Sequence, residues 1–145
     1  SPPLYSSAAS DVYKRQVYGR GMSVTPLDSC QVTAVHPEKV ALTRERIPDE
    51  REAGRLAGLF KLLGDPRRAR VLYALLEAGE LCVCDLAASV DVAEASVSQV
   101  LRVLRTAGVV ENRREGRMVY YRLADGHVRM LLDVSREHAR HEGQG

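Results

Sequence analysis

Two short amphipathic helical patterns, joined by a tight turn, are followed directly by an arginine-rich β-hairpin pattern. This order of elements predicts a winged helix-turn-helix, which is a mainly α-helical fold with a β-hairpin as its wing. A generic three-helix bundle with a solvated hairpin is the alternative. The predicted elements are a helix from Cys84 to near Asp91, a helix from about Ala93 to Thr106, and strands at Val109–Val110 and Met118 to Leu123, with Gly116 in the turn between them.

The spacing of apolar residues decides which side of the second helix faces outward. The small Ala87 allows the two helices to approach closely, and Asp91 stands at the turn, where glycine is usual. Aspartate tolerates a left-handed backbone better than most residues, so the turn is retained. Outward Ser and Gln side chains can bond base edges, while hairpin arginines can follow the phosphate backbone. The predicted packing residues are Leu86, Ala87, Val92, Val97, Leu101 and Leu104; the predicted DNA contacts are Ala95, Ser96, Ser98, Gln99, Arg102, Arg113, Arg114 and Arg117.

Positive charge is concentrated in this region rather than in the whole chain. The formal net charge of the 145 residues is only +2. Between Val100 and Arg122, however, there are six arginines and two acids, Glu111 and Glu115, a local excess of +4. Such an excess suits a surface that faces phosphates, although a solvated helix face is the alternative. With one Phe and no Trp to stack on single-stranded bases, duplex DNA is the favoured partner.

The whole chain divides into four segments. Residues 1–21 are Ser/Ala/Pro-rich and precede Met22, so we interpret them as a non-native leader or a disordered arm. Residues 22–48 form an N-terminal arm and a first helix opening at Pro37; 49–123 form the DNA-binding domain; 124–145 form a C-terminal helix for dimerisation and metal binding. Within the domain we expect helices from Asp49 to Leu63 and from Asp65-Pro66 to Gly79, and the last helix runs from Asp125 to His141. No membrane span or secretory signal is visible, which favours the cytoplasm.

Five stretches of the chain, from about Ala57 to His141, resemble the ArsR/SmtB family of metal-sensing repressors. The stretches are LLGDPRRARVLYALL, GELCVCDLA, ASVSQVLRVLRTAGVV, REGRMVYYRL and DGHVRMLL, of which ELCVCDL is the most specific. The resemblance implies a homodimer, joined through its terminal helices, that binds operator DNA and responds to a metal ion.

Cys82 and Cys84 form a Cys-x-Cys pair of soft ligands, which suit Zn(II), Cd(II), Pb(II) or trivalent arsenic. Residues two apart diverge on a helix, but the pair lies where a helix begins, so both sulfurs can converge. The resemblance adds Cys30 from the arm. Ala34 stands about where the family's cadmium and lead sensors have a second arm cysteine, and His36 is a weaker candidate for that ligand. The alternative is that the pair fills the helix start and Cys30 is an inert surface thiol.

A second candidate metal site lies on the last helix. His138 and His141 share one helix face, and Asp125 and His127 lie about eleven residues earlier, a gap of roughly 16 Å. One metal ion cannot span that gap within one helix, whereas an antiparallel partner helix brings the two halves together. This quartet matches the zinc site that family members carry on their last helix. Exposed histidines without a ligand role are the alternative.

The predicted function is a homodimeric repressor that leaves its operator when Zn(II), Cd(II) or Pb(II) binds. An arsenite-responsive repressor is the alternative, but the family's common arsenite version has a further cysteine where Ala87 stands. A thiol-redox regulator would need a strained disulfide between residues two apart. An enzyme is not expected, because no phosphate loop, nucleophile elbow or His-Glu-x-x-His pair is present. Neither a small-molecule substrate nor a membrane is an expected partner.

Overall fold

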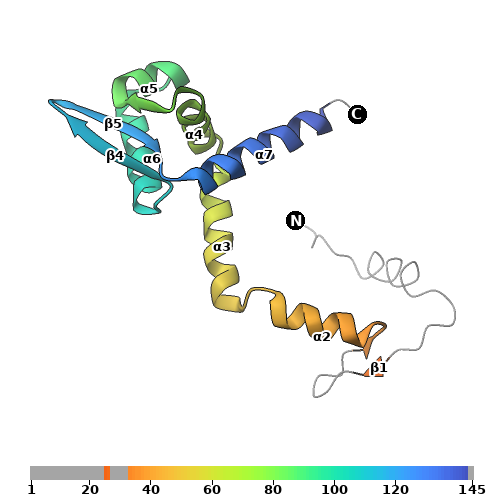
Figure 1. Ribbon diagram of the computed structural model, residues 1–145. Helices are drawn as coiled ribbons and strands as arrows, with labels where there is room; N and C mark the ends of the chain where they lie inside the picture. Colours follow the sequence, from red (N-terminus) through yellow and green to blue (C-terminus); the bar gives the residue numbers. More distant parts are fainter. Residues whose placement is uncertain (1–24, 27–32, 144–145) are drawn as a thin grey trace, which may run out of the picture. The chain divides into compact units, whose positions relative to one another are not determined.

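The computed structural model describes residues 25–26 and 33–143, and the chain divides after Asp49 into two compact units. In the first unit, strand β1 (Thr25–Pro26) pairs antiparallel with β2 (Thr33–Ala34), and helix α2 (Pro37–Arg46) follows (Figure 1). The predicted opening of a helix at Pro37 is confirmed. The predictions for residues 1–21 and for Cys30 fall outside the described residues.

The second unit is a helical domain with a three-stranded antiparallel sheet in the order β3-β5-β4 (Figure 1). The winged helix-turn-helix prediction is thereby confirmed. None of the described helices is both long and apolar enough to cross a lipid bilayer. The elements are α3 (Glu50–Leu63), α4 (Pro66–Ala78), β3 (Glu80–Cys82), α5 (Val83–Val90), α6 (Glu94–Thr106), β4 (Val110–Glu115), β5 (Met118–Leu123) and α7 (Gly126–Glu142).

Aspartate caps the start of two helices, and the ends of α4 are those that the sequence predicts. Asp65 caps α4 by accepting a 3.0 Å hydrogen bond from the Arg68 N–H, and Gly79 ends the helix with a φ of 82°. Asp125 caps α7 in the same way. These side chains satisfy backbone N–H groups that have no partner within the helix, so they determine where each helix starts.

The turn between α5 and α6 has the predicted left-handed residue, since Asp91 adopts φ 54° and ψ 51°. The turn brings α5 and α6 into contact over a shared apolar core. Val92 and Val100 are only partly buried and pack against that core. The core residues contributed by these two helices are Leu86, Ala87, Val90, Val97, Leu101 and Leu104.

The sheet differs from the sequence prediction in two ways. First, β3 was not predicted; its three residues pair with Tyr120 to Arg122 of β5. Second, the first strand of the hairpin was predicted at Val109–Val110, but β4 runs from Val110 through Glu115 and so includes charged residues. Charged side chains fit there because this half of the hairpin is exposed to solvent. Gly116 lies in the turn as predicted, with a φ of 60°.

Leu101→Ala tests whether the core orients α6. Leu101 is fully buried, and its truncation is expected to lower the free energy of unfolding by about 2–5 kcal/mol, because a cavity replaces lost contacts. Val103 lies on the same helix but is 42% exposed, so Val103→Ala is the matched control, with an expected cost below about 0.5 kcal/mol. Urea unfolding measures both; equal losses would contradict the assigned packing face.

Candidate functional site

The outward face of α6 carries most of the predicted base-reading residues. Because Val97, Leu101 and Leu104 point into the core, Ala95, Ser98, Gln99 and Arg102 are exposed, while Ser96 is half-buried. These exposed side chains offer a hydroxyl, an amide and a guanidinium along one helix face. That set can bond both base edges and phosphates.

Two hollows flank α6 and add residues that the sequence did not predict. One, of about 330 Å³, lies between α6 and β5 and is lined by Ser98, Arg102, Arg105, Thr106 and Tyr121. The other, also about 330 Å³, is lined by Arg67 and Arg70 of α4, by Ser96 and Gln99 of α6, and by several valines. Arg67, Arg70 and Arg105 make no ion pair within the part of the chain that the structure describes. Sequence spacing could have suggested Arg105, which lies one turn beyond Arg102, but not the α4 arginines.

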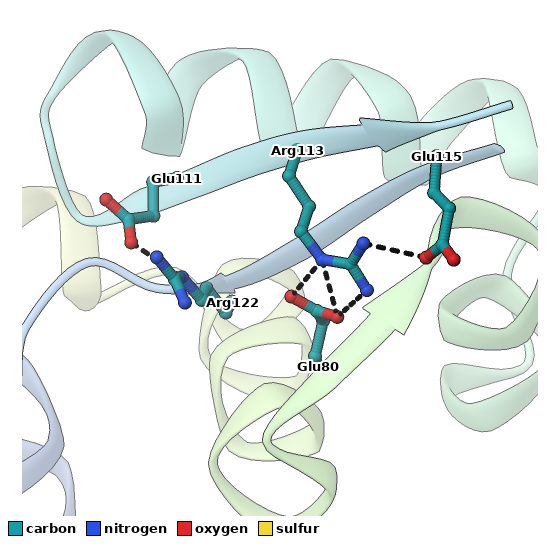
Figure 2. Close-up of polar contacts among 5 residues, drawn as sticks. All are labelled: Glu80, Glu111, Arg113, Glu115 and Arg122. Atoms are coloured by element: carbon teal, nitrogen blue, oxygen red, sulfur yellow. Dashed lines mark hydrogen bonds and ion pairs between the residues drawn. The ribbon is translucent and has the colours of Figure 1, made fainter.

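The wing arginines fall into two groups. Arg114 and Arg117 are exposed near the hairpin tip, with no ion pair to any described residue. Arg113 instead contacts two carboxylates, at 2.6 Å from Glu80 and 2.7 Å from Glu115 (Figure 2). These hydrogen bonds raise the pKa of Arg113 and lower that of Glu80. The predicted phosphate contact by Arg113 therefore has intramolecular competitors.

The two cysteines converge as the sequence predicts. Cys82 is the N-cap of α5 and is still extended, at φ −75° and ψ 165°, so its Sγ lies 3.1 Å from the Sγ of Cys84. The Asp85 carboxylate, which was not predicted, joins them, and the three ligand atoms lie within 4.8 Å of one another. Among the described residues no other group of three His, Cys, Asp or Glu side chains comes this close. Asp85 follows Cys84 directly in the sequence. The direction of its side chain depends on where α5 starts, which is at Val83.

Burial and neighbouring groups favour the neutral thiol form of Cys82. Cys82 is 3% exposed, whereas Cys84 is exposed. The backbone N–H of Asp85 lowers the pKa of Cys82, but hydrogen bonding with Cys84, burial and the nearby Asp85 carboxylate together raise it above its usual value. A metal ion that bound here would have to displace a proton from this sulfur, so its binding would depend on pH.

The three histidines predicted as ligands of the second metal site are exposed on α7. The Asp125 carboxylate caps the helix, accepting hydrogen bonds from the His127 and Val128 N–H groups at 2.9 and 3.0 Å. His138 lies 3.4 Å from Glu142, and His141 lies 3.9 Å from Glu137. Within one chain the structure does not bring Asp125 and His127 together with His138 and His141.

Of the two candidate ligands in the N-terminal arm, only His36 lies among the described residues. His36 is exposed at the start of α2, where its side chain makes no capping hydrogen bond. His36 belongs to the first unit, whereas Cys82 belongs to the second. Cys30 is outside the described residues.

A helix-turn-helix, a strand-paired wing and an arginine-bearing outer face together define a winged helix-turn-helix regulator. Residues 65–112 match the model of the bacterial regulatory protein family named arsR. The chain belongs to this ArsR family, whose members are transcriptional regulators, as the sequence motifs indicate.

The alignments with similar proteins cover most of the chain. A cadmium resistance transcriptional regulatory protein CadC homolog from Staphylococcus aureus is 37% identical over 113 residues, which cover 78% of this chain and 93% of that protein. A transcriptional repressor SmtB homolog from Synechocystis is 44% identical over 112 residues, 77% of this chain and 82% of that protein. The solution structure of a homodimeric winged helix-turn-helix DNA-binding domain from Mycobacterium bovis, a possible ArsR-family regulator, is 30% identical with a TM-score of 0.59, and covers 67% of this chain and 92% of that one.

Proposed function

We propose that this protein is a metal-responsive repressor that binds operator DNA as a homodimer and leaves it when Zn(II), Cd(II) or Pb(II) binds. The observation that carries the proposal is the pair of sulfurs 3.1 Å apart at the start of α5, the helix that packs against the DNA-reading helix α6. The similarity to a cadmium resistance regulator supports a thiophilic metal. The protein acts by binding and not by catalysis.

The donor set at α5 fits such a metal. Tetrahedral Zn(II) with sulfur ligands at about 2.3 Å needs the two sulfurs roughly 3.8 Å apart, so the pair must open by less than 1 Å. Asp85 supplies a third donor within reach. A fourth donor is expected from Cys30 or His36 of the arm. Because reduced thiols are required, the cytoplasm is the expected compartment.

Apolar side chains left exposed on two helices support the homodimer. Leu56 and Phe60 of α3 are exposed, Phe60 by 61%, and Met130 and Val134 of α7 are exposed, Met130 by 64%. Large apolar side chains gathered on helix faces are typical of surfaces that bind another protein chain. A dimer also sets two copies of α6 at the spacing of operator half-sites, and the similar domain from Mycobacterium bovis is homodimeric.

Metal binding must be linked to DNA binding energetically. If metal binds the DNA-free conformation more tightly, DNA affinity falls by the same factor. The test is a cadmium titration of the purified protein bound to a labelled duplex, which is first selected from a random pool by the metal-free protein. A fall in fluorescence anisotropy at stoichiometric cadmium supports the proposal. A complex that stays intact under saturating cadmium and zinc contradicts it.

Gln99→Ala and Arg114→Ala separate base reading from phosphate binding. Gln99→Ala is expected to lose about 1–3 kcal/mol of discrimination between the selected and a random duplex, because an amide can read a base edge. Arg114→Ala is expected to weaken binding to both duplexes and to lower the salt slope by about one. Arg51→Ala, on α3, is the control. If both variants bind like this control, the DNA surface is misassigned.

A further inference from the structure

One row of side chains crosses the sheet from the thiolate pair to the wing. In the strand register, Cys82 of β3 lies opposite Tyr120 of β5, and Tyr120 lies opposite Arg113 of β4. Directly opposite residues in antiparallel strands share one face of the sheet and lie close together. The candidate metal ligand Cys82 and the wing residue Arg113 are therefore separated by a single tyrosine.

A second connection runs along the same face. The Arg113 guanidinium lies 4.7 Å from the centre of the Tyr120 ring and reaches over β5 to Glu80 of β3. Its Nε donates to both carboxylate oxygens of Glu80 at 3.0 Å, and its Nη2 donates to Oε1 at 2.6 Å (Figure 2). We call this contact the Glu80–Arg113 clamp. It joins β3 and β4, which are not neighbours in the sheet.

The clamp lies where the hairpin leaves the sheet. β3 pairs with β5 only as far as Tyr120, so the pairs Arg114–Val119 and Glu115–Met118 extend beyond the third strand. The exposed Arg114 and Arg117 belong to this projecting part. The hydrogen bonds from Arg113 to Glu80 and Glu115 lie at the base of this projecting part and stabilise its position.

We infer that the Glu80–Arg113 clamp transmits metal binding at Cys82 and Cys84 to the wing; this rests on the proposed thiolate site. The sulfurs must move apart to hold a metal ion. Cys82 is 3% exposed and its main chain pairs with Tyr120 of β5, so a displacement of its sulfur is passed on to β3. Glu80 is two residues away on that short strand, so it moves with Cys82 and pulls Arg113. Arg113 and Glu80 are 47% and 28% exposed, and ion pairs this accessible add little stability. Their role is to position the wing.

The sheet offers a matched control. Arg122 and Glu111 form a 2.6 Å ion pair on the same face, and their side chains are more exposed, at 58% and 45% (Figure 2). This pair joins β5 to β4. Arg122 also lies opposite Glu80 in the strand register, but the two side chains form no ion pair with each other. Glu111→Gln therefore removes one wing ion pair without cutting the connection to the thiolate strand, whereas Glu80→Gln cuts it.

The experiment measures the release factor, which is the Kd for the selected duplex with saturating cadmium divided by the Kd without it. Glu80→Gln is expected to lower the release factor about fivefold while the ultraviolet cadmium–thiolate absorption stays at the parent's level. Glu111→Gln is expected to keep the parent's release factor. If Glu80→Gln releases DNA as the parent does, this inference is overturned and the proposed function stands. If the parent itself is not released, both are overturned.

A double-mutant cycle guards against indirect effects. Arg113→Gln changes both the clamp and any phosphate contact of this arginine, but the release factor is a ratio and cancels a constant loss of DNA affinity. If the two residues act through one contact, the double variant Glu80→Gln/Arg113→Gln has the same release factor as Glu80→Gln alone. A double variant whose loss is the sum of both single losses overturns the clamp.

Discussion

Cys82→Ser and Cys84→Ser are each expected to lower cadmium affinity by about 100-fold or more and to leave the protein on its operator under cadmium. Each substitution removes one of the two sulfurs that the structure places 3.1 Å apart, and a hydroxyl is a poor ligand for a soft metal ion. The measurement is the thiolate-to-cadmium absorption in the ultraviolet, followed together with fluorescence anisotropy of the labelled duplex.

Cys30→Ser completes this series. A smaller loss of absorption is expected if the arm supplies a ligand, and no loss would leave the arm out of the site. Absorption that persists unchanged in both Cys82→Ser and Cys84→Ser would make the pair a structural feature of the α5 start.

Two inactive α7 variants are expected to restore each other when mixed. His127→Ala and His138→Ala should each lose the proposed α7 zinc site as homodimers, because each homodimer lacks a ligand in both of its sites. In a mixed dimer, one chain still supplies Asp125 and His127, and the other supplies His138 and His141. One intact site per dimer is expected, so zinc stoichiometry falls to about half of the parent's, with partial release of DNA.

Equilibrium dialysis of tagged, co-purified heterodimers measures this stoichiometry. Arg140→Ala is the control, because Arg140 lies between the two histidines of the same turn but is not a proposed ligand. A dimer that binds zinc as tightly with both His138 and His141 removed would reduce the tail histidines to surface residues. Regulation would then rest on the cysteines.

The predictions that the structure confirms rest on local sequence signals. The start of α4 follows from Asp65 and Pro66, the turn from Asp91, and the hairpin from Gly116, because each acts on backbone atoms within a few residues. The convergence of Cys82 and Cys84 was also predictable, since it depends only on where one helix begins.

Long-range pairing explains what the sequence did not reveal. β3 has only three residues, too few for a clear alternating pattern, and it exists because β5, about forty residues later, pairs with it. For the same reason the sequence does not reveal that Arg113 is paired, because its partner Glu80 lies 33 residues earlier. The direction of Asp85 and the α4 arginines beside α6 likewise depend on packing between elements.

The carboxylate of Asp125 caps α7 and is also a proposed zinc ligand. Oδ1 of Asp125 accepts both N–H groups of the first turn, so the side-chain rotamer is already fixed, and Oδ2 makes no hydrogen bond to a described residue. If Asp125 binds zinc as proposed, the metal meets a ligand that has lost its rotational freedom during folding, and the entropic cost of coordination is correspondingly smaller. Asp125 would then both start the helix and bind the metal ion. Fraying of the first turn would loosen zinc without altering a single histidine.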